Sequence, residues 1–313
     1  MRKYANERRW RKIQSFLPKQ NRITGTTAPS EECLRLGTTL LHIDHYKSQS
    51  PKGVVVIFHG VGGNGRLLAF IAVPLWKAGY EVVCPDLPMY GLTEYKGKVT
   101  YSDWIDCGTK VCRRYRKQGI PLFVFGLSAG GLLAYQVACR LDKVDGMIAT
   151  CLLDQRNPTV TMNTASNRIT AVVGKPFLRI VHGLFGSVKI PMKMVCNMQA
   201  IVNDERVARL LISDPLSSGA KVTLAFIHGM LNPDICPEAK DFRKCPVLLV
   251  HPKKDNWTDV SLSKLFFDDI PERKELVMLQ GAGHFPIEPF GLSVLENECR
   301  RFMDNIVRID GMK

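Results

Sequence analysis

The chain has 313 residues and carries 43 Lys and Arg against 29 Asp and Glu, a formal net charge of +14 at pH 7. No run approaches about 18 consecutive apolar residues, which argues against a transmembrane helix, and the basic N-terminus lacks the apolar core of a secretory signal. The ten cysteines include no CxxC pair and several lie in apolar, strand-like runs, so we expect reduced thiols, a cytoplasmic location and no zinc site.

The N-terminal segment 1–22 contributes half of the net charge, with eight Lys or Arg and one Asp or Glu. Trp10, Ile13 and Leu17 recur at helical spacing and would share one helix face. We favour a helix that packs this apolar stripe on the domain, and the alternative is an interfacial helix that contacts an anionic membrane surface. No nucleic-acid-binding motif accompanies the charge, so we expect no nucleic-acid partner.

Strand-like and helix-like segments alternate from residue 36 onward. Continuous apolar runs predict strands over 36–46, 54–58, 80–86, 121–126, 144–150, 246–252 and 275–281. Apolar residues at helical spacing predict helices over 66–78, 101–118, 129–142, 260–268 and 290–308. This alternation predicts an α/β fold with a mostly parallel sheet that helices cover on both faces.

Residues 155–240 interrupt the alternation and are too long for a single crossover between two strands. They contain scattered methionines and helix-like pieces such as 205–212. We interpret this stretch as an inserted helical cap, or lid. It divides the core into residues 36–154 and 241–313, and a basic N-terminal extension over 1–35 precedes the core.

The stretch Gly126-Leu127-Ser128-Ala129-Gly130 lies where a predicted strand gives way to a predicted helix. It matches the nucleophile elbow G-x-S-x-G, in which a serine occupies a sharp, strained turn. The glycines remove Cβ atoms that would clash in such a turn. The following helix would direct its N-terminal amides toward developing negative charge. We therefore predict that Ser128 is a nucleophile.

A second glycine-rich stretch, HGVGGN over 59–64, follows the strand predicted over 54–58. His59, Gly60 and Gly62 leave the backbone free to point amides into a cavity, which suits one half of an oxyanion hole. The alternative is a plain glycine-rich loop or a phosphate cradle. A Walker loop is excluded because no Lys-Ser/Thr pair follows the glycines.

An acid and a histidine follow the last two predicted strands. Asp255 lies a few residues beyond strand 246–252, with Asp259 as a competitor, and His284 follows a Gly-Ala-Gly loop. The order serine, acid, histidine is that of α/β-hydrolases and differs from the orders of chymotrypsin and subtilisin. We expect Asp255, rather than Asp259, to orient His284.

With these motifs the sequence resembles the α/β-hydrolase superfamily and, within it, the lysophospholipase and monoacylglycerol-lipase-like branch. The similar stretches are HGVGG (59–63), PDLPMYGLT (85–93), GLSAGG (126–131), DPL (214–216), the Asp255 loop and GAGHF (281–285), and together they cover roughly residues 36–308. The resemblance implies that Ser128 is the nucleophile, His284 the general base and Asp255 its orienting acid. It further implies an oxyanion hole from the amides of Val61 and Ala129, without a metal or an organic cofactor.

The sequence departs from the branch at two places. Pro252-Lys253-Lys254 stands where relatives have glycine before the acid. Met89 and Tyr90 stand where relatives carry glycine and histidine, which predicts a loop shaped for a different substrate.

The resemblance implies a serine hydrolase that cleaves carboxylic esters of acyl or lipid-like substrates through an acyl-enzyme, with the cap supplying an apolar acyl pocket. A serine at the elbow argues against dehalogenases and epoxide hydrolases, which would carry aspartate there. Two alternatives stay open. One is an amidase, aminopeptidase or acyl-lactone hydrolase with the same three residues, and the other is a non-catalytic ligand-binding protein of this fold.

Overall fold

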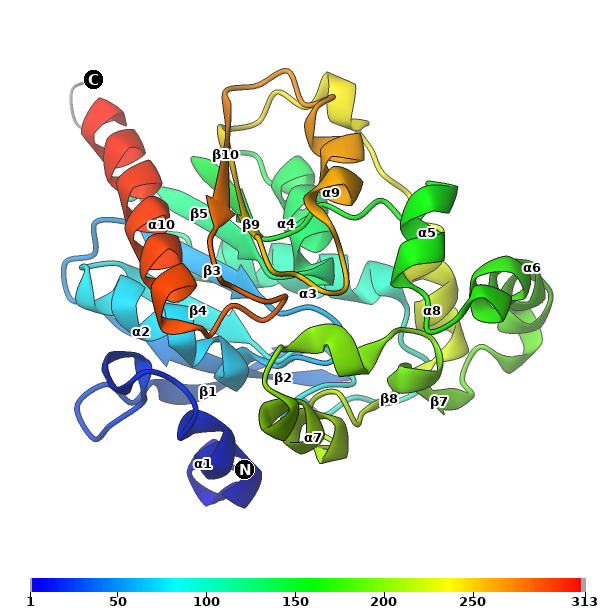
Figure 1. The fold of residues 1–313 in the computed structure, drawn as a ribbon. Coiled ribbons are helices and arrows are strands. Elements are labelled where there is room, and N and C mark those ends of the chain that lie inside the picture. Colours follow the sequence, from blue (N-terminus) through cyan, green and yellow to red (C-terminus); the bar gives the residue numbers. More distant parts are fainter. Residues whose placement is uncertain (1, 311–313) are drawn as a thin grey trace.

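The computed structural model describes residues 2–310. Its core is an eight-stranded sheet (Figure 1). Its strands lie in the order β1-β2-β4-β3-β5-β6-β9-β10, and only the pairs β1–β2 and β2–β4 are antiparallel. The strands are β1 Ser30–Leu36, β2 Thr39–Tyr46, β3 Val54–Phe58, β4 Glu81–Pro85, β5 Leu122–Gly126, β6 Gly146–Ala149, β9 Val247–Pro252 and β10 Lys274–Leu279. The predicted α/β class with a mostly parallel sheet is confirmed.

Helices cover both faces of this sheet (Figure 1). On one face, α2 (Ala69–Lys77) packs against α10 (Pro289–Asp310), and on the other α3 (Tyr101–Tyr115) packs against α4 (Ala129–Arg140). The short helix η3 (Gly65–Leu68) precedes α2, and α9 (Val260–Phe267) follows β9. Because helices shield both faces, every residue of β3, β4, β5 and β9 is buried. That burial explains why these strands are continuous apolar runs in the sequence.

The residues between β6 and β9 form a mainly helical layer beside the sheet, drawn in green to yellow in Figure 1. Its strands β7 and β8 form a separate antiparallel pair. The elements are α5 Pro158–Thr164, α6 Arg168–Phe185, β7 Lys189–Pro191, η4 Met192–Met194, η5 Met198–Ile201, α7 Glu205–Ser213, β8 Lys221–Thr223, α8 Leu224–Leu231 and η6 Ala239–Asp241. We refer to residues 155–240 as the cap.

The sheet begins earlier in the chain than the sequence predicted. Strand β1 pairs with β2 across a tight turn at Gly37, which has a φ of 61°. The expected boundary between extension and core at residue 35 therefore falls inside β1. This edge strand escaped prediction because its side chains are exposed or only partly buried, so the segment SEECLRL is largely polar.

The N-terminal residues fold onto the domain through η1 (Tyr4–Asn6), α1 (Arg8–Gln14) and η2 (Lys19–Asn21). Trp10, Ile13 and Leu17 are all buried in the main core, which confirms the favoured interpretation of this apolar stripe. The basic side chains of α1 remain exposed. Among the described residues, no helix combines the length and the apolar character that crossing a bilayer requires.

Candidate active site

Ser128 occupies a strained turn between β5 and α4. Its φ of 55° and ψ of −125° lie outside the conformations that side chains usually allow. A Cβ on Gly126 would lie 1.9 Å from the carbonyl oxygen of Gly130, and one on Gly130 would lie 2.5 Å from that of Phe58. Both glycines are therefore required by the close packing of the turn, which directs the serine toward the carboxyl edge of the sheet.

His284 lies in the loop after β10 and joins Ser128 to Asp255. Its Nε2 is 2.6 Å from Ser128 Oγ, and its Nδ1 is 2.7 Å from Asp255 Oδ2. Burial alone would raise the pKa of Asp255, but its interactions with His284 and its hydrogen bonds from Thr258 together outweigh burial and bring the pKa to about 2. The ionised carboxylate can only accept a hydrogen bond, so Nδ1 donates to it and Nε2 is left to accept from the serine hydroxyl.

Asp255 is held in place by the residues that follow it. Its Oδ1 accepts hydrogen bonds from the backbone amides of Trp257 and Thr258, each at 2.8 Å. The loop before it lacks glycine but is fixed by two backbone hydrogen bonds, because Lys253 donates to Leu279, the last residue of β10, and Lys254 donates to Ala282. Asp259 has a different place, because it caps the N-terminus of α9 through the amide of Ser261.

Three further residues contact Ser128, His284 or Asp255 and were not predicted. The Thr258 hydroxyl donates to Asp255 Oδ2 at 2.7 Å and lies 3.2 Å from His284 Nδ1. The Trp257 ring lies against His284 with 4.8 Å between ring centroids. Thr150 accepts a hydrogen bond from the Ser128 amide at 2.9 Å. The turn D-x-x-T could have indicated Thr258, whereas nothing local distinguishes Thr150.

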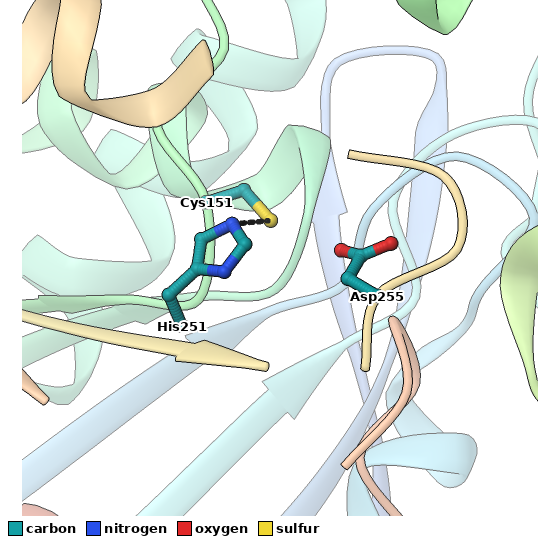
Figure 2. A group of neighbouring side chains, drawn as sticks. All are labelled: Cys151, His251 and Asp255. Carbon is teal, nitrogen blue, oxygen red and sulfur yellow. Dashed lines mark hydrogen bonds between the residues drawn. The ribbon is translucent and has the colours of Figure 1, made fainter. Parts of the chain in front are cut away.

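Cys151 and His251 lie beside Asp255 (Figure 2). Burial lowers the pKa of His251, and its Nδ1 donates to the carbonyl of Pro252, so Nε2 faces the Cys151 thiol at 3.9 Å. Burial also raises the pKa of Cys151, which keeps the thiol protonated. A cation bound among these three side chains would compete with the hydrogen bonds that Asp255 already accepts, so we assign the pair a packing role.

The glycine-rich loop 59–64 packs directly against the serine turn. A Cβ on Gly60 would lie 2.7 Å from the Leu127 carbonyl oxygen and 3.1 Å from the Ala129 nitrogen. Val61 and Ala129 line one cavity together with Ser128. The structure therefore places both residues predicted to supply amide donors at the cavity beside Ser128. We call residues 60–64 the oxyanion loop, after the role that the sequence predicts for them.

His59 supports this loop as a neutral side chain. Burial lowers its pKa to about 4. Its Nδ1 donates to the Gly60 carbonyl at 2.8 Å, and its Nε2 accepts from the Leu87 amide at 2.9 Å. Tyr90, one of the two departures from the family pattern, packs edge-on against the His59 ring at 5.5 Å. The other departure, Met89, has a φ of 79°, and its sulfur accepts from the Thr223 amide of the cap.

The DPL segment of the cap, residues 214–216, fastens the cap to the core. The Leu216 carbonyl accepts from the Asn64 side chain at 3.0 Å and from the Gly91 amide at 2.9 Å. Two residues later, the Ser218 hydroxyl donates to the carbonyl of Gly62, whose φ is 78°. The cap is therefore hydrogen-bonded to the oxyanion loop at Gly62 and Asn64.

Two small cavities meet at Ser128. One of about 40 Å³ is lined by Val61, Tyr101, Ser128, Ala129, Leu132, Leu153, Gln155, Thr164, Cys196, Met230, Trp257 and Thr258. The other, of about 30 Å³, is lined by residues 59–64, Leu67, Leu68, Leu127, Ser128, Ile201, Leu211, His284 and Phe285. At roughly 10–15 Å³ per water, each holds about two or three water molecules. The cap contributes residues to both cavities.

A buried ionic network that includes Asp86 and His42 binds the backbone directly after the oxyanion loop. Asp86 Oδ1 accepts from the Gly65 amide at 2.6 Å, and its Oδ2 accepts from the Leu92 amide at 2.7 Å. Burial would lower the pKa of His42, but the adjacent carboxylates of Asp86 and Glu31 raise it to about 10. The imidazolium in turn holds the pKa of Asp86 below its usual value despite burial.

The raised pKa of His42 predicts a loss of stability at alkaline pH. The unfolded side chain titrates near about 6.5, so its stabilising contribution is complete below that pH and is lost as the pH rises toward about 10. Melting temperatures of the wild type and His42→Gln should therefore differ most near pH 6 and converge by about pH 10. A difference that stays constant over this range would contradict the assignment.

Comparison with known proteins places these motifs in one family. Residues 49–287 match the family described as serine aminopeptidase S33 (Hydrolase_4). The chain is 25% identical over 277 residues to a monoglyceride lipase from Saccharomyces cerevisiae, covering 81% of this chain and 85% of that protein. It is also 25% identical over 235 residues to phospholipase YtpA from Bacillus subtilis, covering 72% and 84%.

A solved structure shares the fold over nearly the whole chain. The crystal structure of a soluble variant of the Saccharomyces cerevisiae monoglyceride lipase, in complex with a substrate analogue, superposes with a TM-score of 0.72 at 21% identity. The match covers 91% of this chain and 97% of that one.

Proposed function

Because the chain belongs to the serine aminopeptidase S33 family of α/β-hydrolases, we propose that it is a serine hydrolase of carboxylic esters with acyl or lipid-like substrates. The observation that carries this proposal is the continuous hydrogen-bonded series from Ser128 through His284 to Asp255. Relatives named monoglyceride lipase and phospholipase favour esters over amides. A serine, a histidine and an aspartate that are already hydrogen-bonded in this order argue against a purely ligand-binding role.

The chemistry follows from the protonation states. Nε2 of His284 removes the proton as Ser128 Oγ attacks the ester carbonyl, while ionised Asp255 stabilises the imidazolium. The amides of Val61 and Ala129 hold the oxyanion of the tetrahedral intermediate. His284 then protonates the departing alcohol. It finally activates a water that releases the acid and restores the serine.

The first test compares two of the three proposed catalytic side chains with a matched acid. Ser128→Ala and Asp255→Asn should each lower kcat for p-nitrophenyl butyrate by about 10⁴-fold. Asp259→Asn keeps a side-chain oxygen that can accept from the Ser261 amide and cap α9, so it should retain both kcat and stability. Activity that survives in Ser128→Ala would refute the proposal. Faster cleavage of p-nitroanilides than of esters would favour the amidase alternative.

Cavity size predicts acyl specificity. Met230, on α8, lines the cavity beside Ser128. Met230→Ala should enlarge this cavity and raise the preference for p-nitrophenyl octanoate over acetate by about tenfold, because each extra buried methylene contributes roughly 0.8 kcal/mol. Met162→Ala, at an exposed methionine of the cap, is the control and should leave the preference unchanged. Equal effects of the two substitutions would contradict this cavity as the acyl site.

We propose that the cap helix α6, and not the N-terminal segment 1–22, contacts lipid. The apolar stripe of the N-terminal segment is buried, whereas α6 exposes Ile169, Val172, Phe177, Ile180, Leu184 and Phe185. Residues 155–203 contain six Lys or Arg and no Asp or Glu, which suits an anionic surface. Buried thiols at Cys84, Cys112 and Cys245 further support a cytoplasmic, peripheral location.

Vesicle co-sedimentation tests this contact. Ile180→Ser with Leu184→Ser should weaken binding to phosphatidylglycerol vesicles by about tenfold or more, because two exposed apolar side chains lose their burial. Leu265→Ser with Phe290→Ser removes exposed apolar side chains outside the cap and is the matched control. If Arg8→Gln with Arg11→Gln abolishes binding and the α6 variant does not, the contact belongs to residues 1–22.

A further inference from the structure

The N-terminal segment lies outside the family match, yet it contacts the support of the oxyanion loop. The match begins at residue 49. Residues 4–17, which we call the N-terminal strap, run along the outside of the core near α7 of the cap (Figure 1). Two of its aromatic side chains, Tyr4 and Trp10, are buried against Arg66.

Tyr4 is bound to the ionic network by three of its groups. Its hydroxyl donates to Asp86 Oδ2 at 2.8 Å, across 82 positions of sequence. Its backbone amide donates to Glu31 Oε2 at 2.9 Å. Its ring lies 4.6 Å from the guanidinium carbon of Arg66. At 2% exposure, Tyr4 is an integral part of the core and not a loosely attached terminal residue.

Arg66 connects the strap to the oxyanion loop, because it follows the loop by two residues in η3. The Trp10 ring lies 5.8 Å from its guanidinium carbon, so the cation contacts two aromatic rings of the strap. Arg66 Nη2 also donates to Asp44 Oδ1 of β2 at 2.8 Å and lies 3.3 Å from Glu31. The strap and the first hairpin therefore fix the position of Arg66 together.

Asp86 links Tyr4 to two further segments, the start of η3 after the oxyanion loop and the loop 86–92. It accepts from the Gly65 amide on one side and the Leu92 amide on the other. A Cβ on Gly91 would lie 2.1 Å from its carboxyl carbon, so the loop 86–92 packs tightly around this carboxylate. Loss of the Tyr4 hydroxyl would leave the buried Asp86 carboxylate with one hydrogen-bond donor fewer. It would thereby loosen the two hydrogen bonds that Asp86 accepts from the Gly65 and Leu92 amides.

We propose that the N-terminal strap is a positioning element for catalysis, in which Tyr4 and Trp10 hold Asp86 and Arg66 so that the oxyanion loop stays aligned with Ser128. The proposal rests on the proposed function to the extent that this loop stabilises an oxyanion. Neither strap residue touches the substrate cavities beside Ser128. Their effect would therefore reach the reaction only through the alignment of the Val61 amide.

The kinetic test compares Tyr4→Phe with Tyr115→Phe. Both substitutions remove one hydroxyl that donates to a carboxylate at 2.8 Å, and the partner of Tyr115 is Glu32, on β1. Tyr4→Phe should lower kcat for p-nitrophenyl butyrate by about tenfold with KM within about twofold, less than the roughly 100-fold expected when an oxyanion donor is lost outright. Affinity for a trifluoromethyl ketone, which forms an oxyanion on binding, should fall in parallel.

Tyr115→Phe should leave kcat and inhibitor affinity unchanged. Equal losses in the two variants, or a Tyr4→Phe enzyme with wild-type kcat and inhibitor affinity, would overturn the proposal. A Tyr4→Phe variant that changes KM alone would overturn it as well, because misalignment of an oxyanion donor acts on the transition state.

Amide hydrogen exchange separates this proposal from the proposed function, because it requires no activity. Exchange in residues 60–66 and 87–92 should be at least about tenfold faster in Tyr4→Phe than in Tyr115→Phe, with α4 unchanged in both. Unchanged exchange in these loops would overturn the positioning role. If the wild type hydrolyses no ester while exchange still rises, the proposed function fails and the structural role of the strap stands.

Discussion

The backbone turn at Ser128 is the constraint on which the rest of the site depends. Its φ of 55° is unfavourable for a residue with a side chain, and it persists because β5, α4 and the oxyanion loop close around it. Glycines at 60, 126 and 130 permit carbonyl oxygens to approach within distances that no Cβ would allow. The same crowding that strains the serine thus brings the oxyanion loop beside it.

Two buried carboxylates organise the loops around that turn in similar ways. Asp255 follows β9 and Asp86 follows β4, and each accepts hydrogen bonds from two backbone amides. A histidine stabilises the ionised form of each, His284 in one case and His42 in the other. One carboxylate orients the proposed base and the other fixes the support of the oxyanion loop. The electrostatic design therefore extends well beyond the three proposed catalytic side chains.

Much of the fold could be read from the sequence because the buried strands and the strained turn leave strong local patterns. The core strands are apolar throughout, and the predicted elements from residue 54 to the last helix lie within about three residues of those observed. Strand β1 and the contacts of the strap could not be read in this way. An exposed edge strand is polar, and the Tyr4–Asp86 hydrogen bond joins residues that only the folded chain brings together. The role of Thr150 depends likewise on tertiary position, whereas Thr258 follows Asp255 by only three residues.

Covalent labelling tests the central claim, that Ser128 is an activated nucleophile, most directly. Incubation of the wild-type protein with a fluorophosphonate, followed by intact mass measurement and peptide mapping, should give a single adduct on Ser128. The adduct should form rapidly at pH 8 and be absent from His284→Ala, because the hydroxyl reacts only when Nε2 accepts its proton. Absence of an adduct, or an adduct on another residue, would contradict the account.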